Sequence, residues 1–236
     1  MTKTPSDEGQ MNVIKSAVIA TAFFLTAGAV QATTLQASDD AFLRDGSFSN
    51  SNNNGAQITV KHPRGLSPGF HRFGILKFDL NGIASLTDAT LQLTLAQTQS
   101  GTSGLRLYAM DDAAGDGWDE TTVTRNNAPA FGAAGLSETT LLQTLNVGAG
   151  TAAGTVLSFS NTALVDFLNN GAGADGLVTF GLEATGSGGN TTIQIVSSEG
   201  TGTGPQLSVV PVPIPLSGAL ALSGIGAMVL VKSRSS

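Results

Sequence analysis

The class of fold is decided by the segment Ala89-Thr90-Leu91-Gln92-Leu93-Thr94-Leu95, in which an apolar residue occupies every second position. In an extended chain successive side chains point to opposite faces, so the apolar residues of this segment share one face. That pattern is typical of a β-strand with one side on a hydrophobic core. We therefore expect residues 89–95 to form a strand of a sheet that is buried on one face.

Similar segments recur on both sides of this one. Further strands are predicted at residues 41–44, 57–61, 75–80, 105–110, 155–159, 177–184, 191–197 and 206–210. Segments rich in Gly, Asn and Ser separate them, and these residue types favour turns. Many short strands at this spacing predict an all-β fold, specifically a jelly-roll β-sandwich.

One short helix is expected after the strand at 155–159. Ser160 or Asn161 can cap its first turn, and Gly171 can end it. Its apolar stripe consists of Leu164, Val165 and Leu168. No repeat or second domain is apparent, so residues 33–210 are predicted to form a single domain.

Composition restricts the function of this domain. Residues 33–210 contain 7 Lys and Arg against 15 Asp and Glu, a net charge of −8. An acidic domain is poorly suited to neutralising phosphates, which argues against binding nucleic acid. The chain has no Cys, which excludes disulfides, thiolate metal sites and a Cys nucleophile.

The two ends of the chain are predicted to be targeting signals. Residues 1–32 are expected to be a signal peptide, because Lys15 precedes about a dozen apolar residues and a small-residue cleavage pattern ends at Ala32. Met11 is an alternative start, since Asp7 and Glu8 are unusual in such a signal. The alternative structural interpretation is a buried helix of the domain.

The C-terminal residues 211–236 are expected to form a Pro-rich stalk followed by a hydrophobic helix. Residues 216–231 carry no charge, and Lys232 and Arg234 follow them. A helix of this length spans about 24 Å, which is short for a bilayer. This segment resembles the PEP-CTERM sorting signal, although the Glu usual between the prolines is missing. The resemblance implies export and sorting by an exosortase-type membrane protease; a plain inner-membrane anchor is the alternative.

The most specific motif is Gly117-Trp118-Asp119-Glu120-Thr121-Thr122-Val123-Thr124-Arg125-Asn126-Asn127-Ala128-Pro129. It resembles the DNRLRE domain, a group that includes carbohydrate-binding module family 96. Residues 40–46, 77–80, 89–93, 197–199 and 205–207 agree with the same family in order. The resemblance implies a jelly-roll sandwich in a cell-surface or extracellular protein that binds polysaccharide. Arg125 stands where the family usually has an aromatic residue.

Sugar binding requires aromatic rings and planar polar side chains, and the motif offers both. Candidate ligand-binding residues are Trp118, Arg125, Asn126 and Asn127. The alternative interpretations are that Trp118 plugs the core at one end of the sandwich and that the asparagines form turns ahead of Pro129.

A second group of candidates lies in the segment 62–73. Arg64 and Arg72, together with His71, can bind a carboxylated sugar such as a uronate through forked contacts of the guanidinium groups. A loop that is merely solvated is the alternative interpretation of this segment.

Structural calcium is the one cofactor that the sequence suggests, because calcium needs several oxygen ligands. One predicted site combines Asp40 with Glu199, and another uses Asp116 and Asp119 from the acidic segment 111–120. A solvated acidic loop is the alternative.

No arrangement of residues predicts catalysis. The chain has no Gly-x-Ser-x-Gly nucleophile motif, and its two His residues, His62 and His71, lie in one segment. Asp119 and Glu120 are adjacent, which is a weak signature for a pair of glycosidase carboxylates.

The leading hypothesis is therefore an exported cell-surface or matrix protein that binds extracellular polysaccharide without cleaving it. A structural envelope or biofilm component without specific sugar recognition is the rival hypothesis. The scarcity of aromatic residues and the presence of Arg125 favour the rival.

Overall fold

The computed structural model describes residues 31–62, 71–83, 85–110, 115–129, 131–132, 135–136, 139–171, 173, 175–186 and 191–213. Within these residues the protein is an all-β sandwich with a short helix. Its elements are β1 (Thr33–Gln36), β2 (Asp39–Arg44), a 3-10 turn (Gly46–Phe48), β3 (Gln57–His62), β4 (Arg72–Asp79), β5 (Leu86–Thr94), β6 (Ser103–Met110), β7 (Phe131–Gly132), β8 (Gly135–Leu136), β9 (Thr139–Val147), β10 (Val156–Phe159), α2 (Thr162–Asn170), β11 (Leu177–Thr185), β12 (Thr191–Val196) and β13 (Gln206–Pro211).

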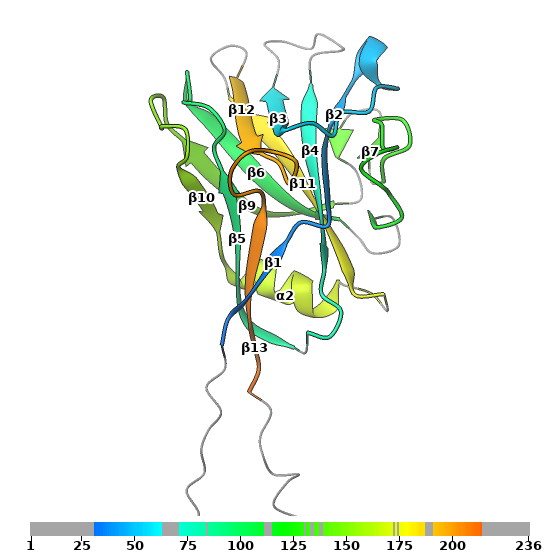
Figure 1. Ribbon diagram of the computed structural model, residues 1–236, viewed down its shortest axis with the longest axis vertical. Helices are drawn as coiled ribbons and strands as arrows, with labels where there is room; N and C mark the ends of the chain where they lie inside the picture. Colours follow the sequence, from blue (N-terminus) through cyan, green and yellow to red (C-terminus); the bar gives the residue numbers. More distant parts are fainter. Residues whose placement is uncertain are drawn as a thin grey trace, which may run out of the picture. The chain divides into compact units, whose positions relative to one another are not determined.

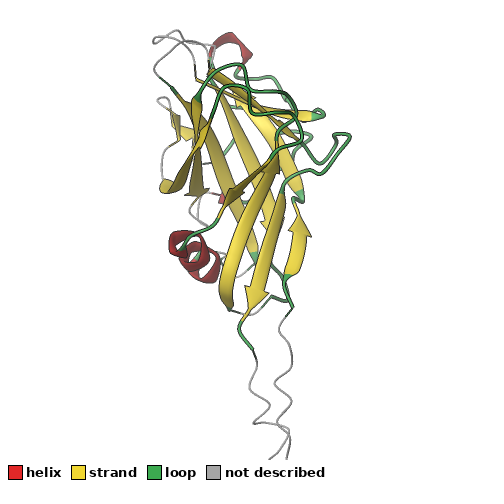
Figure 2. Ribbon diagram, turned by 90° about the vertical axis from the view of Figure 1, so that its left-hand side faces the viewer, coloured by secondary structure: helices red, strands yellow, loops and turns green. Residues whose placement is uncertain are grey.

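Two antiparallel sheets pack face to face (Figures 1 and 2). The smaller sheet has the strand order β1-β13-β5-β10. The larger sheet has the order β12-β3-β4-β11-β6-β9, with β2 also paired to β4. A bridge between Leu95 and Ile195 joins the two sheets along one side. Strands that are neighbours in space are mostly distant in sequence, so the sandwich brings remote segments together.

The core between the sheets follows from the alternation in the sequence. In β5 the even-numbered polar residues face outward, while Ala89, Leu91 and Leu93 are buried in the main cluster. In β4 the faces have different partners: Leu76 and Phe78 point into the sandwich, whereas Ile75 belongs to a second cluster on the outer face of the larger sheet. The outer face of β4 is therefore covered, and what covers it determines the site described below.

The predicted strands are confirmed, but the short strand β1 and the long strand β9 were not predicted. β1 is four residues of Thr, Leu and Gln that the sequence does not distinguish from a linker, yet it pairs with β13 from Thr33 to Gln36. β9 is nine residues long, but its register with β6 shifts beside Leu107 and Tyr108. Such a bulge places neighbouring residues on unexpected faces, so Leu141 is exposed and Leu142 is buried, and the alternation is hidden.

Helix α2 forms where it was expected and lies across one end of the sandwich (Figure 1). The side chain of Asn161 accepts a hydrogen bond from the backbone N–H of Leu164 at 2.8 Å, which caps the first turn. Leu164 and Leu168 are buried in the main core, as the apolar stripe predicted.

The helices predicted for the signal segment and for the C-terminal hydrophobic segment lie outside the described residues. Among the residues that are described, no helix is both long enough and apolar enough to cross a bilayer.

Candidate functional site

The segment 115–129 folds over the outer face of the larger sheet and covers β2 and β4. Trp118 and Val123 from this segment are buried against Ala41, Leu43 and Ile75 of the two strands. Trp118 is only 6 % exposed, and its indole Nε1 donates to Thr179 Oγ1 at 3.1 Å. Its ring therefore offers no free face to a sugar, and the alternative interpretation of Trp118 as a core residue describes this arrangement.

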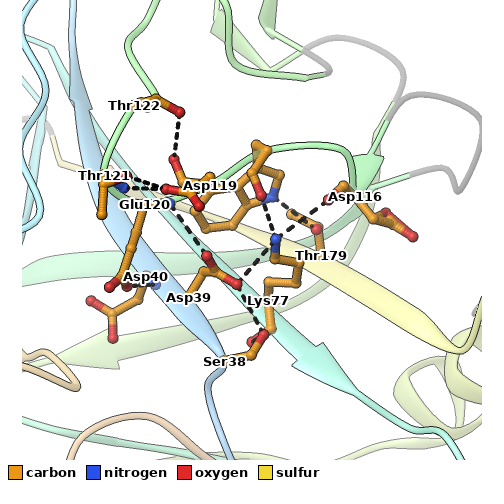
Figure 3. Close-up of polar contacts among 11 residues, drawn as sticks. Ser38, Asp39, Asp40, Lys77, Asp116, Asp119, Glu120, Thr121, Thr122 and Thr179 are labelled. Atoms are coloured by element: carbon orange, nitrogen blue, oxygen red, sulfur yellow. Dashed lines mark hydrogen bonds and ion pairs between the residues drawn. The ribbon is translucent and has the colours of Figure 1, made fainter.

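Lys77 of β4 holds the same segment against the sheet, as Figure 3 shows. Its side chain is nearly buried and forms an ion pair with Asp39 at 3.0 Å. The Nζ atom also donates to the backbone carbonyl of Trp118 and lies 4.8 Å from the centre of the indole ring. This charged group thus fixes the position of the segment that carries the family-like motif.

A cluster of carboxylates lies beside this attachment. Asp40 is fully buried; its Oδ2 accepts the backbone N–H of Ser198 at 2.7 Å, while its Oδ1 has no hydrogen-bond partner among the described residues. Burial raises the pKa of Asp40 to about 6, and the negative charges of Glu199 and Glu120 act in the same direction. Burial likewise raises the pKa of Glu120, and a hydrogen bond with Glu199 raises it further.

The predicted calcium ligands are only partly brought together. Asp40 and Glu199 are close enough for their charges to interact, and Glu120, which was not assigned to that site, joins them. Asp119 instead accepts hydrogen bonds from Thr121 within its own turn. In the part of the chain that is described, no three His, Cys, Asp or Glu side chains stand together as metal ligands. The calcium sites at Asp40 with Glu199 and at Asp116 with Asp119 therefore stay predictions.

The two asparagines of the motif have different environments. Asn127 Oδ1 accepts the backbone N–H of Thr124 at 2.6 Å, and its Nδ2 donates to the carbonyl of Thr122 at 3.2 Å. This is the turn-forming role given above as its alternative. Asn126 is exposed and donates through its side chain to Asn50 Oδ1 at 2.6 Å, which leaves a pair of amide groups at the surface.

Arg125, at the position where an aromatic residue is usual in the family, is nearly buried. Its guanidinium carbon lies 5.6 Å from the centre of the Phe73 ring, and burial lowers the pKa of its side chain. The side chain therefore packs on an aromatic ring of β4.

Two further arginines meet at the same end of the larger sheet. Arg44 at the end of β2 is directly opposite Arg72 at the start of β4, so both side chains point to the same side of the sheet. Burial and the charge of Arg44 both lower the pKa of Arg72. Within the described residues neither arginine has a carboxylate at ion-pair distance. Like charges directly opposite each other are destabilising, so this pair is an uncompensated positive site.

Aromatic rings hold these two guanidinium groups in place. The guanidinium carbon of Arg44 lies 3.8 Å from the centre of the Phe48 ring, and that of Arg72 lies 5.9 Å from the Phe42 ring. Phe48 is 44 % exposed, whereas Trp118 is not accessible. An exposed ring next to fixed guanidinium groups can contact both the apolar face and the charged groups of a sugar.

Most of the positive charge of the domain lies at this end. Lys61 in β3 is opposite Arg72 in the neighbouring strand. Arg125 packs over Phe73 of β4 on the other face of the sheet. Four of the six described Lys and Arg residues therefore lie at this end of the sheet, and we call Arg44, Lys61, Arg72 and Arg125 the basic end. The predicted Arg64 lies outside the described residues.

Sequence reasoning missed Arg44 and Phe48. Both occur in a segment that was assigned only to the first strand and its following turn, and nothing in their spacing links them to Arg72. Arg106 and Tyr108 were also not assigned a role; with Glu183 they form a polar group on the outer face, where the Tyr108 hydroxyl donates to Glu183 Oε2 at 2.8 Å.

Comparison with known protein families identifies one whose model matches this chain. Residues 31–211 match the family model described as carbohydrate-binding module family 96, so the match extends from β1 to β13 and includes both sheets. It thereby confirms the resemblance drawn from the motif at 117–129. No curated protein matches the chain.

Proposed function

The chain belongs to carbohydrate-binding module family 96, and from this premise we propose that its sandwich binds an acidic polysaccharide at the basic end without cleaving it. The observation that carries this proposal is the Arg44–Arg72 pair, which lies across two strands without a carboxylate partner among the described residues. A carboxylated sugar would supply the missing negative charge.

The geometry fits a ligand of this class. Guanidinium groups bind carboxylates with two parallel hydrogen bonds, and the rings of Phe48 and Phe42 restrict the two arginines before the ligand arrives. The exposed amides of Asn50 and Asn126 are suited to sugar hydroxyls. The acidic remainder of the domain would repel a polyanion, so binding would be confined to this end.

The same proposal includes the location. A signal peptide at residues 1–32 and the sorting-signal-like segment 211–236 would carry the domain outside the cytoplasmic membrane and hold it there, at least transiently. A polysaccharide of the cell surface or matrix would then be the natural partner.

The rival function is a structural matrix component that recognises no particular sugar. The burial of Trp118 favours it, because the only Trp of the chain is not accessible to a ligand. The two functions differ in whether the basic end has a specific ligand.

Binding of the full chain to immobilised polygalacturonate tests the proposal, with neutral dextran as the reference. Replacing both Arg44 and Arg72 by Gln should weaken binding on the order of a hundredfold, since each charge-assisted contact is worth about 1.5–3 kcal/mol. Arg72→Lys should keep the charge but lose the forked contact, and should be intermediate.

Arg106→Gln is the matched control, because it removes an arginine that already has Glu183 as its partner. It should bind like the native chain. Equal retention of the double variant and the native chain, or no preference for polygalacturonate over dextran, would favour the structural rival.

A further inference from the structure

The only two histidines of the chain contact each other at the basic end. His71 Nε2 lies 3.2 Å from His62 Nδ1, and the centres of the two rings are 5.1 Å apart. His62 ends β3 and His71 immediately precedes β4, so each is next in the chain to a basic residue, Lys61 or Arg72. Because neighbouring residues of a strand point to opposite faces, His71 lies on the side of Phe73, whose ring centre is 5.3 Å from its own, and not on the side of Arg72. Arg125 packs over the same Phe73 ring and its charge acts on His71, so the pair lies beside this member of the basic end.

The contact between the rings limits where protons can be. A neutral imidazole has one N–H donor and one acceptor nitrogen, so one ring donates to the other across the 3.2 Å contact. If both facing nitrogens carried hydrogens, the two N–H groups would oppose each other. The pair in this geometry can therefore take up one additional proton but not two.

The structure also indicates where that proton would be held. His71 Nδ1 faces away from His62, and it lies 3.9 Å from Asp45 Oδ2. Asp45 Oδ1 accepts the backbone N–H of His71 at 3.1 Å, which fixes the carboxylate beside the ring. With a proton on each nitrogen, His71 would donate to His62 through Nε2 and face Asp45 through Nδ1.

The other charges around His71 oppose one another. Burial lowers the pKa of His71, and His62 and Arg125 lower it further, whereas Asp45 and Glu183 raise it. Arg72 follows in the chain. Burial, the largest of these effects, favours the uncharged ring, whereas a lower pH or additional negative charge nearby favours the charged ring.

We infer that the His62–His71 pair regulates the basic end, so that the affinity for acidic polysaccharide increases as the surroundings become mildly acidic. This inference rests on the proposed function. A polyanion bound at the basic end would place carboxylates near Arg125 and thus near His71, and it would favour the charged form of the ring. Binding would be accompanied by uptake of a proton, and by linkage a proton would strengthen binding.

The test compares the affinity of the full chain for polygalacturonate between about pH 8 and about pH 5, a range in which His titrates and the uronate carboxylates remain charged. We expect affinity to increase on the order of tenfold as the pH falls, because a shift of one pKa unit on binding corresponds to a tenfold change. His71→Gln, which keeps a planar polar side chain, should lose the increase, so that its affinities at the two ends of the pH range are equal.

Asp40→Asn is the control, because the pKa of Asp40, raised to about 6, also lies in this range and Asp40 belongs to the carboxylate cluster. Its pH dependence of binding should equal that of the native chain. An equal increase in His71→Gln, or loss of the increase in Asp40→Asn alone, would overturn the assignment to the histidine pair.

A second measurement does not depend on any variant. The two histidine resonances of the native chain can be followed by NMR as the pH changes, with and without polygalacturonate. The titration of His71 should move to higher pH when the polysaccharide is present; an unchanged titration in the bound protein contradicts the inference. Binding without pH dependence sinks only the inference, whereas absence of binding at every pH sinks the proposed function as well.

Discussion

Asp40 has a carboxylate whose surroundings favour its protonated form. The side chain is fully buried, one of its oxygens has no hydrogen-bond partner among the described residues, and Glu120 and Glu199 are nearby. Its pKa is raised to about 6, so the folded protein binds more protons than the unfolded chain between about pH 4 and that value. Stability should therefore decrease as the pH rises through this window.

Asp40→Asn should make the protein more stable at neutral pH. The amide oxygen can still accept the N–H of Ser198, while the NH₂ group replaces the oxygen that lacks a donor. We expect a gain of about 1–3 kcal/mol in the free energy of unfolding at neutral pH and a flatter dependence on pH. Urea denaturation at pH values on both sides of the window measures both. A loss of stability at neutral pH would show that the charge itself is required.

At the scale of elements, helix α2 depends on one residue that makes two connections. Asn161 Oδ1 caps the helix, and its Nδ2 donates to the carbonyl of Leu142 in β9 at 2.8 Å. The same side chain therefore begins the helix and ties it to the edge strand of the larger sheet.

Asn161→Ala should cost about 1–2 kcal/mol of stability, since it removes the cap and leaves the N–H of Leu164 without its acceptor. Asn161→Asp keeps the acceptor but not the donor and should lose less. Asn170→Ala, at the exposed end of the same helix, is the matched control and should change stability little. Thermal unfolding of the three variants measures these differences. Equal losses of stability in the two alanine variants would contradict this account.

The segment 115–129 shows how a segment without regular strands can shape the candidate site. It buries the Trp of the family-like motif against β2 and β4 and places Arg125 over Phe73 at the basic end. The accessible aromatic ring comes from a different segment, the turn that carries Phe48.

At the scale of the whole molecule, the domain separates its charges. Residues 33–210 are acidic overall, yet four of the six described Lys and Arg side chains lie at one end, where β2, β3 and β4 meet. Such a distribution directs a polyanion to one region while the rest of the surface repels it.

Export should leave the sandwich complete. Cleavage after Ala32 would make Thr33 the first residue, and Thr33 is also the first residue of β1. We expect the protein recovered outside the cytoplasmic membrane to begin at Thr33, as measured by N-terminal sequencing or intact mass, and Ala32→Leu to block the cleavage. A cytosolic protein with its first residues intact would contradict the predicted location.

The sequence by itself determined the all-β sandwich, most of its strands, the capped helix and the family. These features depend on residues that are close together in the chain: alternation with a period of two, turn residues between strands, and a motif within 117–129. Strand β9 was not predicted for a local reason as well, because its bulge interrupts the alternation on which the prediction of strands depends.

Only the tertiary structure decided which residues form the candidate site. Arg44 meets Arg72 because β2 and β4 pair in one particular register, and a shift by one residue would send the side chains to opposite faces. The burial of Trp118 likewise depends on where a long segment folds back over a sheet. Contacts of this kind arise from the packing of distant segments, and no local pattern of residues encodes them.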